Sequence, residues 1–433
     1  MKVCKFGGSS VANADQIRKV KKIVESDPQR RVVVVSAPGK RHKEDEKITD
    51  MLYTCDALSR KGESIKETFG IIRQRFLEIA SELQVAGSLK DSLDEIEQKI
   101  AAGAGPDYAA SRGEYLSALM IAEFLGAQFV DAQEVVRLTD DGRVDESSYP
   151  LVTERLRGEG VKVMPGFYGA TVNGELKTFS RGGSDISGAI AARGAMAEVY
   201  ENWTDVSGIL MADPRIVDDP KPIKEISYAE IREMASIGAN VFHEEAIAPV
   251  KSIGVPINVK NTNDPSAPGT FIVLNRDSVK DPIVGVSGKK PYRKVLIEKF
   301  MLNRYPDFPG QVLKLLRSKG LSVDFELKGF DTLTLFVAED QEISWEQLSE
   351  ELKRELGADD CRVGSEVAMI GVVGEGLTSN SHITGAAMRA LEELEIHVEG
   401  LNYGGSPITM LIAVPLRKYQ EALKALAKTV AQV

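Results

Sequence analysis

The sequence predicts an α/β protein: a large layered domain with a central, mainly parallel sheet, followed by two smaller α/β modules. The run Val32-Val33-Val34-Val35 is apolar on both faces, which is typical of a strand in the middle of a parallel sheet covered by helices. Beyond residue 291 the pattern repeats, because Val323 and Val398, like Thr334 and Thr409, are 75 positions apart (398 − 323 and 409 − 334). A chain of 433 residues is too long for one core, so two to four domains are expected.

The first part of the chain alternates apolar strands with helical patterns. We expect a short strand over residues 3–6, a helix over 15–25, a β-branched strand over 31–36 and another strand over 161–164. Residues 60–100 are rich in charge with helical spacing, so they predict a helical excursion that caps the sheet. We interpret this excursion as a solvated amphipathic pair of helices that carries no site.

The last third is predicted to contain two copies of a β-α-β-β-α module, each completed by a further strand into a ferredoxin-like sandwich. Lys289-Lys290-Pro291-Tyr292-Arg293 is the expected linker in front of them. The expected elements are strand 295–301, helix 309–318, strands 321–327 and 332–337 and helix 344–356, then strand 367–373, helix 383–394, strands 397–401 and 409–414 and helix 419–431.

Composition and charge narrow the function classes. Charged residues at 27% and hydrophobic residues at 43% describe an ordinary globular protein. The net charge is −10, and the short basic stretch Lys40-Arg41-His42-Lys43 is followed at once by three acidic residues, so nucleic acid is not an expected partner. We find neither a leader pattern nor a run approaching the ~20 apolar residues of a membrane span, which predicts a cytoplasmic protein that does not bind membranes.

Cysteine and histidine give no sign of a metal or nucleophile site. The 3 cysteines and 4 histidines are scattered, at no metal-ligand spacing. We therefore expect no disulfide, no structural zinc and no Cys-His nucleophile.

Two glycine turns are the main signal for chemistry. In Lys5-Phe6-Gly7-Gly8-Ser9-Ser10 a strand passes into a helix, and Ser180-Arg181-Gly182-Gly183-Ser184-Asp185 leads into a second helix rich in small residues. A glycine pair lets the backbone approach a bound group closely, and the free N–H groups at a helix start favour an anion there. The alternative for either turn alone is a plain tight turn with a solvated Lys5.

The two turns together suit phosphoryl transfer. The chain contains no G-x-x-x-x-G-K-[ST], and no G-x-G-x-x-G joins the first strand to its helix, so any phosphate is held on another scaffold. Phosphoryl transfer depends mostly on positioning and charge stabilisation. Lys5 would neutralise the charge on the moving phosphoryl group, and Asp185 would orient that group or its metal.

Five motifs in register make the chain resemble the aspartate kinases over essentially its whole length. They are Lys5-Phe6-Gly7-Gly8-Ser9-Ser10-Val11, Ser36-Ala37-Pro38-Gly39-Lys40, Arg112-Gly113-Glu114 with Ser117, Arg181-Gly182-Gly183-Ser184-Asp185, and Trp203-Thr204-Asp205-Val206-Ser207-Gly208-Ile209. The resemblance implies an enzyme that phosphorylates the β-carboxylate of L-aspartate with MgATP, the first step of lysine, threonine and methionine synthesis.

The resemblance also implies the fold and its boundaries. It implies an amino-acid-kinase fold, an αβα sandwich with a mainly parallel sheet, over residues 1–288, of which about 196–288 bind the nucleotide. Two ferredoxin-like ACT domains follow at 294–363 and 364–433, and strands can be exchanged between them.

Roles carry over to matching residues. Arg181 would clamp the α-carboxylate of aspartate with its planar fork, and Glu114 would take the ammonium group. Ser36, Thr49, Gly183 and Ser184 complete the implied aspartate site. The implied ATP site consists of Lys5, Phe6, Gly7, Gly8, Ser9, Thr204, Asp205, Leu210, Arg215, Asn240 and Val241, with Mg²⁺ entering as MgATP and no further metal ligands expected.

The kinase domain departs from the family pattern in three places. Ser180 replaces a common Gly, and Asn240 replaces a Lys near ATP, so that either one phosphate contact is lost or another lysine, such as Lys260, supplies it. A charged segment, residues 40–47, is also inserted between Ser36 and Thr49.

The ACT modules imply feedback control by lysine, threonine or both. The matching effector residues are Asp307, Gly310 and Gln311 at a helix start and Val323, Asp324 and Phe325 on the next strand. The resemblance implies a homodimer or homotetramer formed through these modules. The second module departs from the family pattern at residues 402–407, where an altered effector site and a purely oligomeric surface stay open as alternatives.

Two other functions stay open at this point. Another amino-acid kinase, acting on glutamate or N-acetylglutamate, would share Lys5, Gly7 and Gly8. A catalytically silent amino-acid sensor on a kinase scaffold would be consistent with Asn240. No homoserine dehydrogenase domain follows the repeat, so a monofunctional form is expected.

Overall fold

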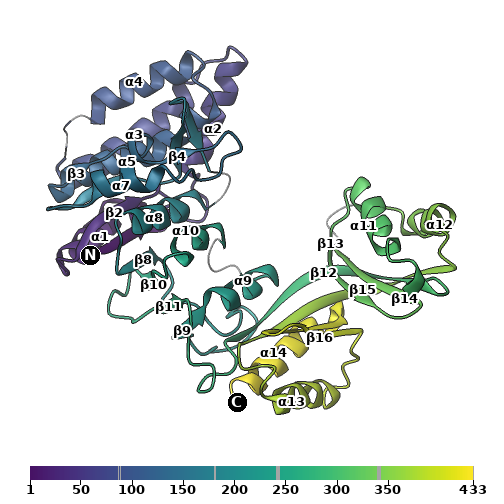
Figure 1. The fold of residues 1–433 in the computed structure, drawn as a ribbon. Coiled ribbons are helices and arrows are strands. Elements are labelled where there is room, and N and C mark those ends of the chain that lie inside the picture. The colour runs from purple at the N-terminus through teal and green to yellow at the C-terminus, as the bar shows by residue number, and fades with distance from the viewer. Residues whose placement is uncertain (86, 88, 180–181, 240–243, 339–342, 433) are drawn as a thin grey trace. The chain divides into compact units, whose positions relative to one another are not determined.

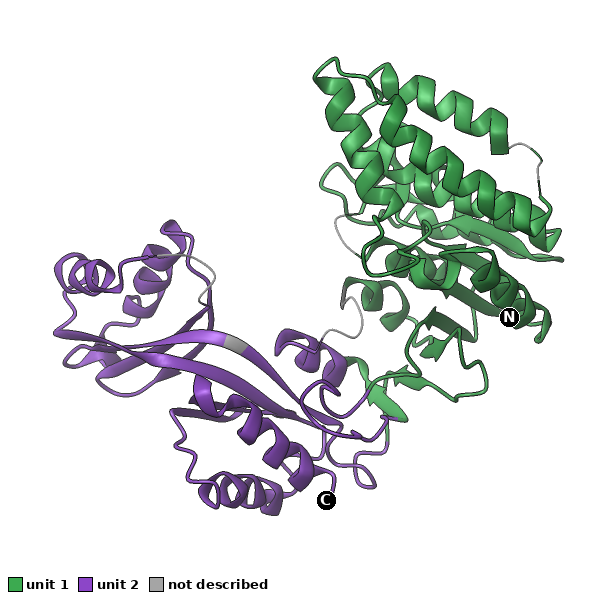
Figure 2. Ribbon diagram, turned by 180° about the vertical axis from the view of Figure 1, so that it is seen from behind, with its two compact units in different colours: residues 1–209, 224–228, 241–276 green, residues 210–223, 229–240, 277–433 purple. Residues whose placement is uncertain are grey.

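The computed structural model describes the chain except for residues 86, 88, 180–181, 240–243, 339–342 and 433. It forms two compact units, drawn green and purple in Figure 2. Unit 1 comprises residues 1–209, 224–228 and 241–276, and unit 2 comprises residues 210–223, 229–240 and 277–433. No helix among the described residues is long and apolar enough to cross a membrane.

Unit 1 is built on an eight-stranded sheet in the order β3-β5-β2-β1-β8-β10-β11-β9 (Figure 1). The strands from β3 to β10 are parallel, and β11 and β9 run the other way. This confirms the predicted mainly parallel sheet. The bounds are β1 (Lys2–Phe6), β2 (Arg30–Val35), β3 (Gln128–Phe129), β5 (Lys162–Pro165), β8 (Val199–Thr204), β9 (Glu225–Ser227), β10 (Ile257–Asn261) and β11 (Thr270–Val273).

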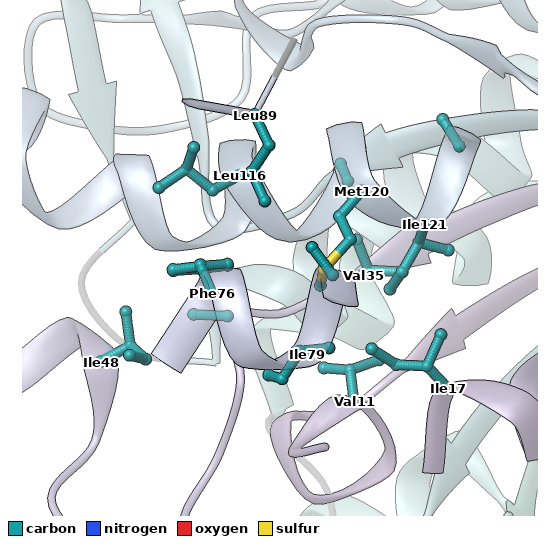
Figure 3. Packing of buried hydrophobic residues seen from close by; sticks show 14 of the residues in the cluster. Val11, Ile17, Val35, Ile48, Phe76, Ile79, Leu89, Leu116, Met120 and Ile121 are labelled. Atoms are coloured by element: carbon teal, nitrogen blue, oxygen red, sulfur yellow. The ribbon is translucent and has the colours of Figure 1, made fainter. Parts of the chain in front are cut away.

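Helices cover both faces of this sheet. Cys4, Phe6, Val33 and Val35 point into a core shared with α1 (Ala14–Glu25), α2 (Ile48–Arg60), α3 (Lys66–Leu83), α4 (Leu89–Ala101) and α5 (Pro106–Leu125). Figure 3 shows side chains of these helices gathered in that core. Successive side chains on a strand point to opposite faces, so Val3 and Lys5 point the other way, toward α8 (Gly183–Gly194), which contacts β1, β2 and β8.

Smaller elements complete unit 1. A three-stranded sheet of β4 (Arg137–Leu138), β6 (Tyr168–Thr171) and β7 (Leu176–Thr178) accompanies α6 (Ala132–Val135) and α7 (Ser148–Leu156). The short helices η1 (Gly8–Val11), η2 (Glu244–Ala246) and α10 (Ile247–Lys251) lie between the larger elements in sequence.

Unit 2 contains a six-stranded antiparallel sheet in the order β13-β14-β12-β15-β17-β16. Its strands are β12 (Gly285–Glu298), β13 (Val323–Lys328), β14 (Thr332–Ala338), β15 (Asp360–Val373), β16 (Gly400–Ser406) and β17 (Thr409–Pro415). Its helices include α11 (Phe308–Ser318), α12 (Trp345–Leu356), α13 (Ser381–Glu392), α14 (Tyr419–Val430) and the short η3 (Leu302–Arg304) and η4 (Leu416–Lys418). The helix α9 (Tyr228–Ser236) precedes them in the chain.

The two long strands, β12 and β15, serve both modules. Val286 of β12 lies in a core with α13 and α14, whereas Val295 of the same strand lies in a second core with α11 and α12. The expected linker at residues 289–293 is therefore wrong, since these residues lie inside β12. Pro291 fits there because the register shifts between Lys289 and Tyr292, where the missing N–H breaks no regular ladder.

Candidate active site

The carboxyl ends of the central strands of unit 1 form one edge, where the chain leaves the sheet. Backbone hydrogen bonds link the segments that emerge there: Ser36 N–H to Phe6 O (3.1 Å), Gly7 N–H to Trp203 O (3.0 Å) and Thr262 N–H to Thr204 O (2.8 Å). In open α/β sheets ligands bind outside the carboxyl ends, where the chain continues to opposite sides of one strand. Here that strand is β1, with β2 on one side and β8 on the other.

The first glycine turn packs closely against the backbone of residues 37–39 at Gly8. A Cβ on Gly8 would lie 3.1 Å from Ala37 O, and one on Gly39 would lie 2.6 Å from the carbonyl carbon of Gly8. The Gly39 N–H also donates to Gly8 O over 2.9 Å. Gly39 is thus part of the predicted phosphate loop, a role that we did not predict from the sequence.

Lys5 and Asp185 meet at this edge. The Lys5 side chain leaves β1 on the face covered by α8, and its Nζ lies 2.6 Å from Asp185 Oδ1 in the first turn of that helix. Asn202 Nδ2 donates to the same oxygen over 2.9 Å, and Tyr200 OH donates to the backbone oxygen of Asp185 over 3.0 Å. Lys5 is 7% exposed, so its charge is held in place and partly shielded from water.

The start of α8 is equally crowded. Gly182 has φ of +60°, a conformation that favours glycine, and a Cβ on Gly183 would lie 2.7 Å from the ring of Phe167. The Ser184 side chain is buried, against Gly166. Arg181, the expected carboxylate clamp, lies outside the described residues, as do Asn240 and Val241.

Glu114 is buried on α5 with an incomplete set of partners. Burial raises the pKa of its carboxyl to about 8, although the N–H groups of Ala37 and Glu114 and the charge of Arg112 oppose the rise. Its Oε2 is buried and has no hydrogen-bond partner within the described part of the chain. The carboxyl faces Ala37, next to Ser36 at the end of β2, and Thr49 lies in the first turn of α2.

Arg112 was quoted in a motif, but no role was predicted for it. It is buried, and its guanidinium carbon lies 4.8 Å, 4.6 Å and 5.1 Å from the ring centres of Tyr108, Tyr115 and Tyr168. Aromatic faces stabilise a cation, so this charge is tolerated near Glu114 without a carboxylate partner within ion-pair distance among the described residues. The sequence signal was Tyr108 and Tyr115, four residues before and three residues after Arg112 on α5, whereas only the fold brings Tyr168 to the same side chain.

The predicted nucleotide residues of segment 204–215 fall into two groups. Thr204 ends β8 at the site edge and Asp205 follows it, with the Thr204 hydroxyl donating to Asp205 over 3.2 Å. Leu210 and Arg215 belong to unit 2, where Arg215 is exposed and pairs with Asp213 at 2.7 Å. Asn202 was missed; it follows Glu201, and both are buried polar residues inside β8.

Lys260 does not take the place of the missing Lys near ATP. It aligns with Trp203, which aligns with Phe6, so its side chain leaves the sheet on the face opposite Lys5. Its ammonium donates to Ala267 O over 2.8 Å and lies 5.3 Å from the Trp203 ring centre. Burial lowers the pKa of Lys260.

Comparison with known proteins decides the family. The amino acid kinase family model matches residues 1–261, and an ACT domain model matches residues 370–430. Aspartokinase 3 of Bacillus subtilis (strain 168) is 35% identical over 98% of both chains. The chain belongs to the aspartokinase family.

Solved aspartokinases share the fold over the whole chain. The aspartate kinase of Clostridium acetobutylicum is 41% identical with a TM-score of 0.93, and the match covers 99% of this chain and 100% of that one. Escherichia coli aspartokinase III, 26% identical over 99% of both chains, superposes with a TM-score of 0.75 in its complex with aspartate and ADP. The structure of the same enzyme in complex with lysine and aspartate superposes with a TM-score of 0.78.

In this aspartokinase the expected effector residues lie in the first module of unit 2. Asp307, Gly310 and Gln311 lie at the start of α11, and Val323, Asp324 and Phe325 lie at the start of β13. The pairing with β14 shifts register between Val323 and Phe325, so Asp324 occupies a bulge. It accepts hydrogen bonds from Lys289 (2.6 Å), Tyr292 (2.8 Å) and Ser322 (3.1 Å).

Proposed function

We propose that this aspartokinase transfers the γ-phosphoryl group of MgATP to the β-carboxylate of L-aspartate, forming 4-phospho-L-aspartate, with the residues that meet at the edge of unit 1. The observation that carries this assignment is the ion pair of Lys5 with Asp185 at 2.6 Å, in which Lys5 lies two residues before Gly7 of the first glycine turn. A fixed cation beside closely packed backbone N–H groups is the arrangement that phosphoryl transfer needs.

The charged side chains and backbone groups at this edge of the sheet suggest a role for each residue. Gly7 and Gly8 would bring the backbone against the ATP phosphates, and Lys5 would stabilise the charge that develops on the phosphoryl group. Asp185 keeps the ammonium of Lys5 aimed and would orient the Mg²⁺ that enters with ATP. Thr204 and Asp205 would bind the nucleotide.

Aspartate would bind between α5 and the end of β2. Its ammonium group would complete the hydrogen bonds of Glu114, whose Oε2 has no partner within the described chain. Ser36, Thr49 and Ser184 supply hydroxyl groups, and we keep Arg181 as the partner of the α-carboxylate. A zwitterion with an extra carboxylate needs both signs of charge around it.

The test is ADP formation from MgATP with L-aspartate, compared with L-glutamate, N-acetyl-L-glutamate and no acceptor, with hydroxylamine present to trap the acyl phosphate. We expect turnover with aspartate alone and a hydroxamate product. Turnover with another acceptor would make the chain a different amino-acid kinase. Amino-acid binding without turnover would make it a sensor.

We propose lysine as the effector, bound at Asp324 in the first ACT module. E. coli aspartokinase III was solved with lysine, which supports lysine over threonine. In unit 2 the Lys289 ammonium already lies 2.6 Å from Asp324 and is 43% exposed. Lys289 thus already pairs with Asp324, the carboxylate that would bind the amine of free lysine.

Lys289→Met is therefore expected to make inhibition by lysine more sensitive. Removing a partly exposed competitor worth about 0.2–1 kcal/mol should lower the half-inhibiting lysine concentration by about 1.4- to 5-fold. Lysine titrations of initial rates measure the shift, and Lys319→Met is the control, because Lys319 pairs with Glu351 elsewhere in the module. An unchanged or weaker inhibition would refute the competition.

Assembly and location stay predictions from the resemblance and the sequence. We expect a homodimer or homotetramer formed through the ACT modules, which light scattering after gel filtration would measure. The cytoplasmic location is likewise untested.

A further inference from the structure

Arg75 is a charged residue on the core-facing side of α3. It is 2% exposed and shares the buried face of the helix with Ile72, Phe76 and Ile79. Figure 3 shows Phe76 and Ile79 in the core of this layer. Arginine stays protonated in proteins, and a buried charge is costly unless it is paired, so this position requires a reason.

Its guanidinium binds both ends of the inserted charged segment. Nη2 donates to Gly39 O, and Nη1 donates to Glu46 O over 3.1 Å. Nη1 also lies 3.3 Å from Asp45 Oδ2. One side chain thus joins two carbonyls that are seven residues apart in sequence (46 − 39).

Asp45 strengthens the same connection from the segment itself. Its carboxylate accepts from the backbone N–H and from Nε of Arg41, both over 2.9 Å. Hydrogen bonds from Arg41, with the charges of Arg75 and Arg41, hold the pKa of Asp45 well below its usual range. The ionised carboxylate of Asp45 therefore lies between two arginines, Arg41 in the segment itself and Arg75 on α3.

The segment connects Arg75 to the glycine turn. Gly39 donates its N–H to Gly8 O over 2.9 Å, and it has no room for a Cβ against the Gly8 backbone. At the other end, Glu46 immediately precedes Lys47, the N-cap of α2, which carries Thr49 in its first turn. Arg75 thus reaches Gly8 through Gly39 alone, and its other partner, Glu46, lies three residues before Thr49 in the chain.

We propose that Arg75 is a positioning residue that holds the 39–46 segment against the Gly7-Gly8 turn and thereby sets the geometry of the phosphate loop. This inference rests on the proposed kinase function. This role of Arg75 departs from our sequence-based interpretation of residues 60–100 as helices without a site. The helical period places Arg75 on the apolar face with Ile72 and Ile79, but no period indicates that its partners come from the segment around Gly39 and Glu46.

The geometry requires an arginine. The planar fork of its guanidinium reaches Gly39 O, Glu46 O and Asp45 at once, which the single ammonium of lysine cannot do. Arg75→Lys is therefore expected to keep the charge and lose the positioning.

The experiment compares Arg75→Met, Arg75→Lys and Asp45→Asn with a matched control, Arg73→Met. Arg73 lies two residues away on α3 but points to Asp94 and Glu97 of α4, with ion pairs of 2.7 Å and 2.6 Å. For each variant kcat and KM for ATP and aspartate are measured, together with the midpoint of thermal unfolding and the rate of tryptic cleavage after Lys40, Arg41 and Lys43.

We expect Arg75→Met and Arg75→Lys to lower kcat/KM for ATP at least 10-fold and to speed cleavage of the segment, with Arg73→Met near wild type in both. Asp45→Asn, on the segment itself, should show the same two changes to a smaller degree even if Arg75→Met folds poorly. Equal kcat/KM for wild type and Asp45→Asn, or a loss in Arg73→Met as large as in Arg75→Lys, would overturn the proposal. A wild-type protein without aspartate-dependent turnover would refute the kinase function instead, while faster cleavage in the variants would still support the link to the segment.

Discussion

Lys5→Met is expected to lower kcat by about 100- to 1000-fold, the loss seen when one preorganised charge donor is removed from a transition state. Lys5 is the cation that lies two residues before Gly7 of the first glycine turn, and its Nζ is held 2.6 Å from Asp185. Asp185 retains the hydrogen bond from Asn202, so the start of α8 keeps one of its anchors in the variant. Steady-state kinetics with saturating aspartate and MgATP measure the effect.

The control for this change is Lys2→Met on the same strand. Lys2 pairs with Asp27 at 2.7 Å, at the amino end of β1 and away from the site edge. Loss of this ion pair should leave kcat within about 2-fold of the wild-type value, because the pair lies away from the site edge. A partly exposed ion pair also contributes at most about 1 kcal/mol to stability, so the variant should stay folded. A kcat for Lys5→Met within 10-fold of wild type would show that Lys5 does not stabilise the transition state of phosphoryl transfer.

Glu114→Gln is expected to raise KM for aspartate by about 10- to 100-fold, with little change in KM for ATP. A hydrogen bond to a charged group is worth about 1.5–3 kcal/mol, and glutamine cannot supply the charge that pairs with the ammonium of aspartate. Glu123→Gln, at an exposed position on the same helix, is the control.

The raised pKa of Glu114 should make aspartate binding depend on pH, because binding releases a proton. In the folded protein without ligand the pKa is about 8, above its ordinary value of 4.5, so the protonated form prevails at pH 7. Aspartate binding needs the ionised form and should release close to one proton at that pH. Calorimetry in phosphate and in Tris, whose ionisation heats differ, measures this release, and Glu114→Gln should abolish it.

Stability provides a second readout of the same carboxyl. A raised pKa means that its contribution to stability is fully present below pH 4.5 and is lost as pH rises toward 8. The free energy of unfolding of Glu114→Gln should therefore increase relative to that of the wild type as the pH rises from 4.5 to 8. A difference that does not change with pH would show that Glu114 is ionised in the ligand-free fold.

The sequence by itself determined the fold class, the family and most of the elements. The apolar run of β2 indicated a buried parallel strand, and the 75-residue repeat indicated paired ferredoxin-like modules, which the family resemblance then identified as ACT domains. Such features are local or periodic, and each is decided by side-chain preference along one segment. For the same reason Lys5, Asp185 and Glu114 could be selected from their motifs before any geometry was known.

Only the tertiary structure decided which of these groups meet and in what state. Lys5 and Lys260 are both lysines of central strands, yet strand alternation and register send them to opposite faces. The raised pKa of Glu114 and the hydrogen-bond partners of Arg75 depend on distant segments that exclude water or supply carbonyl groups. Such effects arise from three-dimensional proximity across many residues of sequence, and no period or motif encodes them.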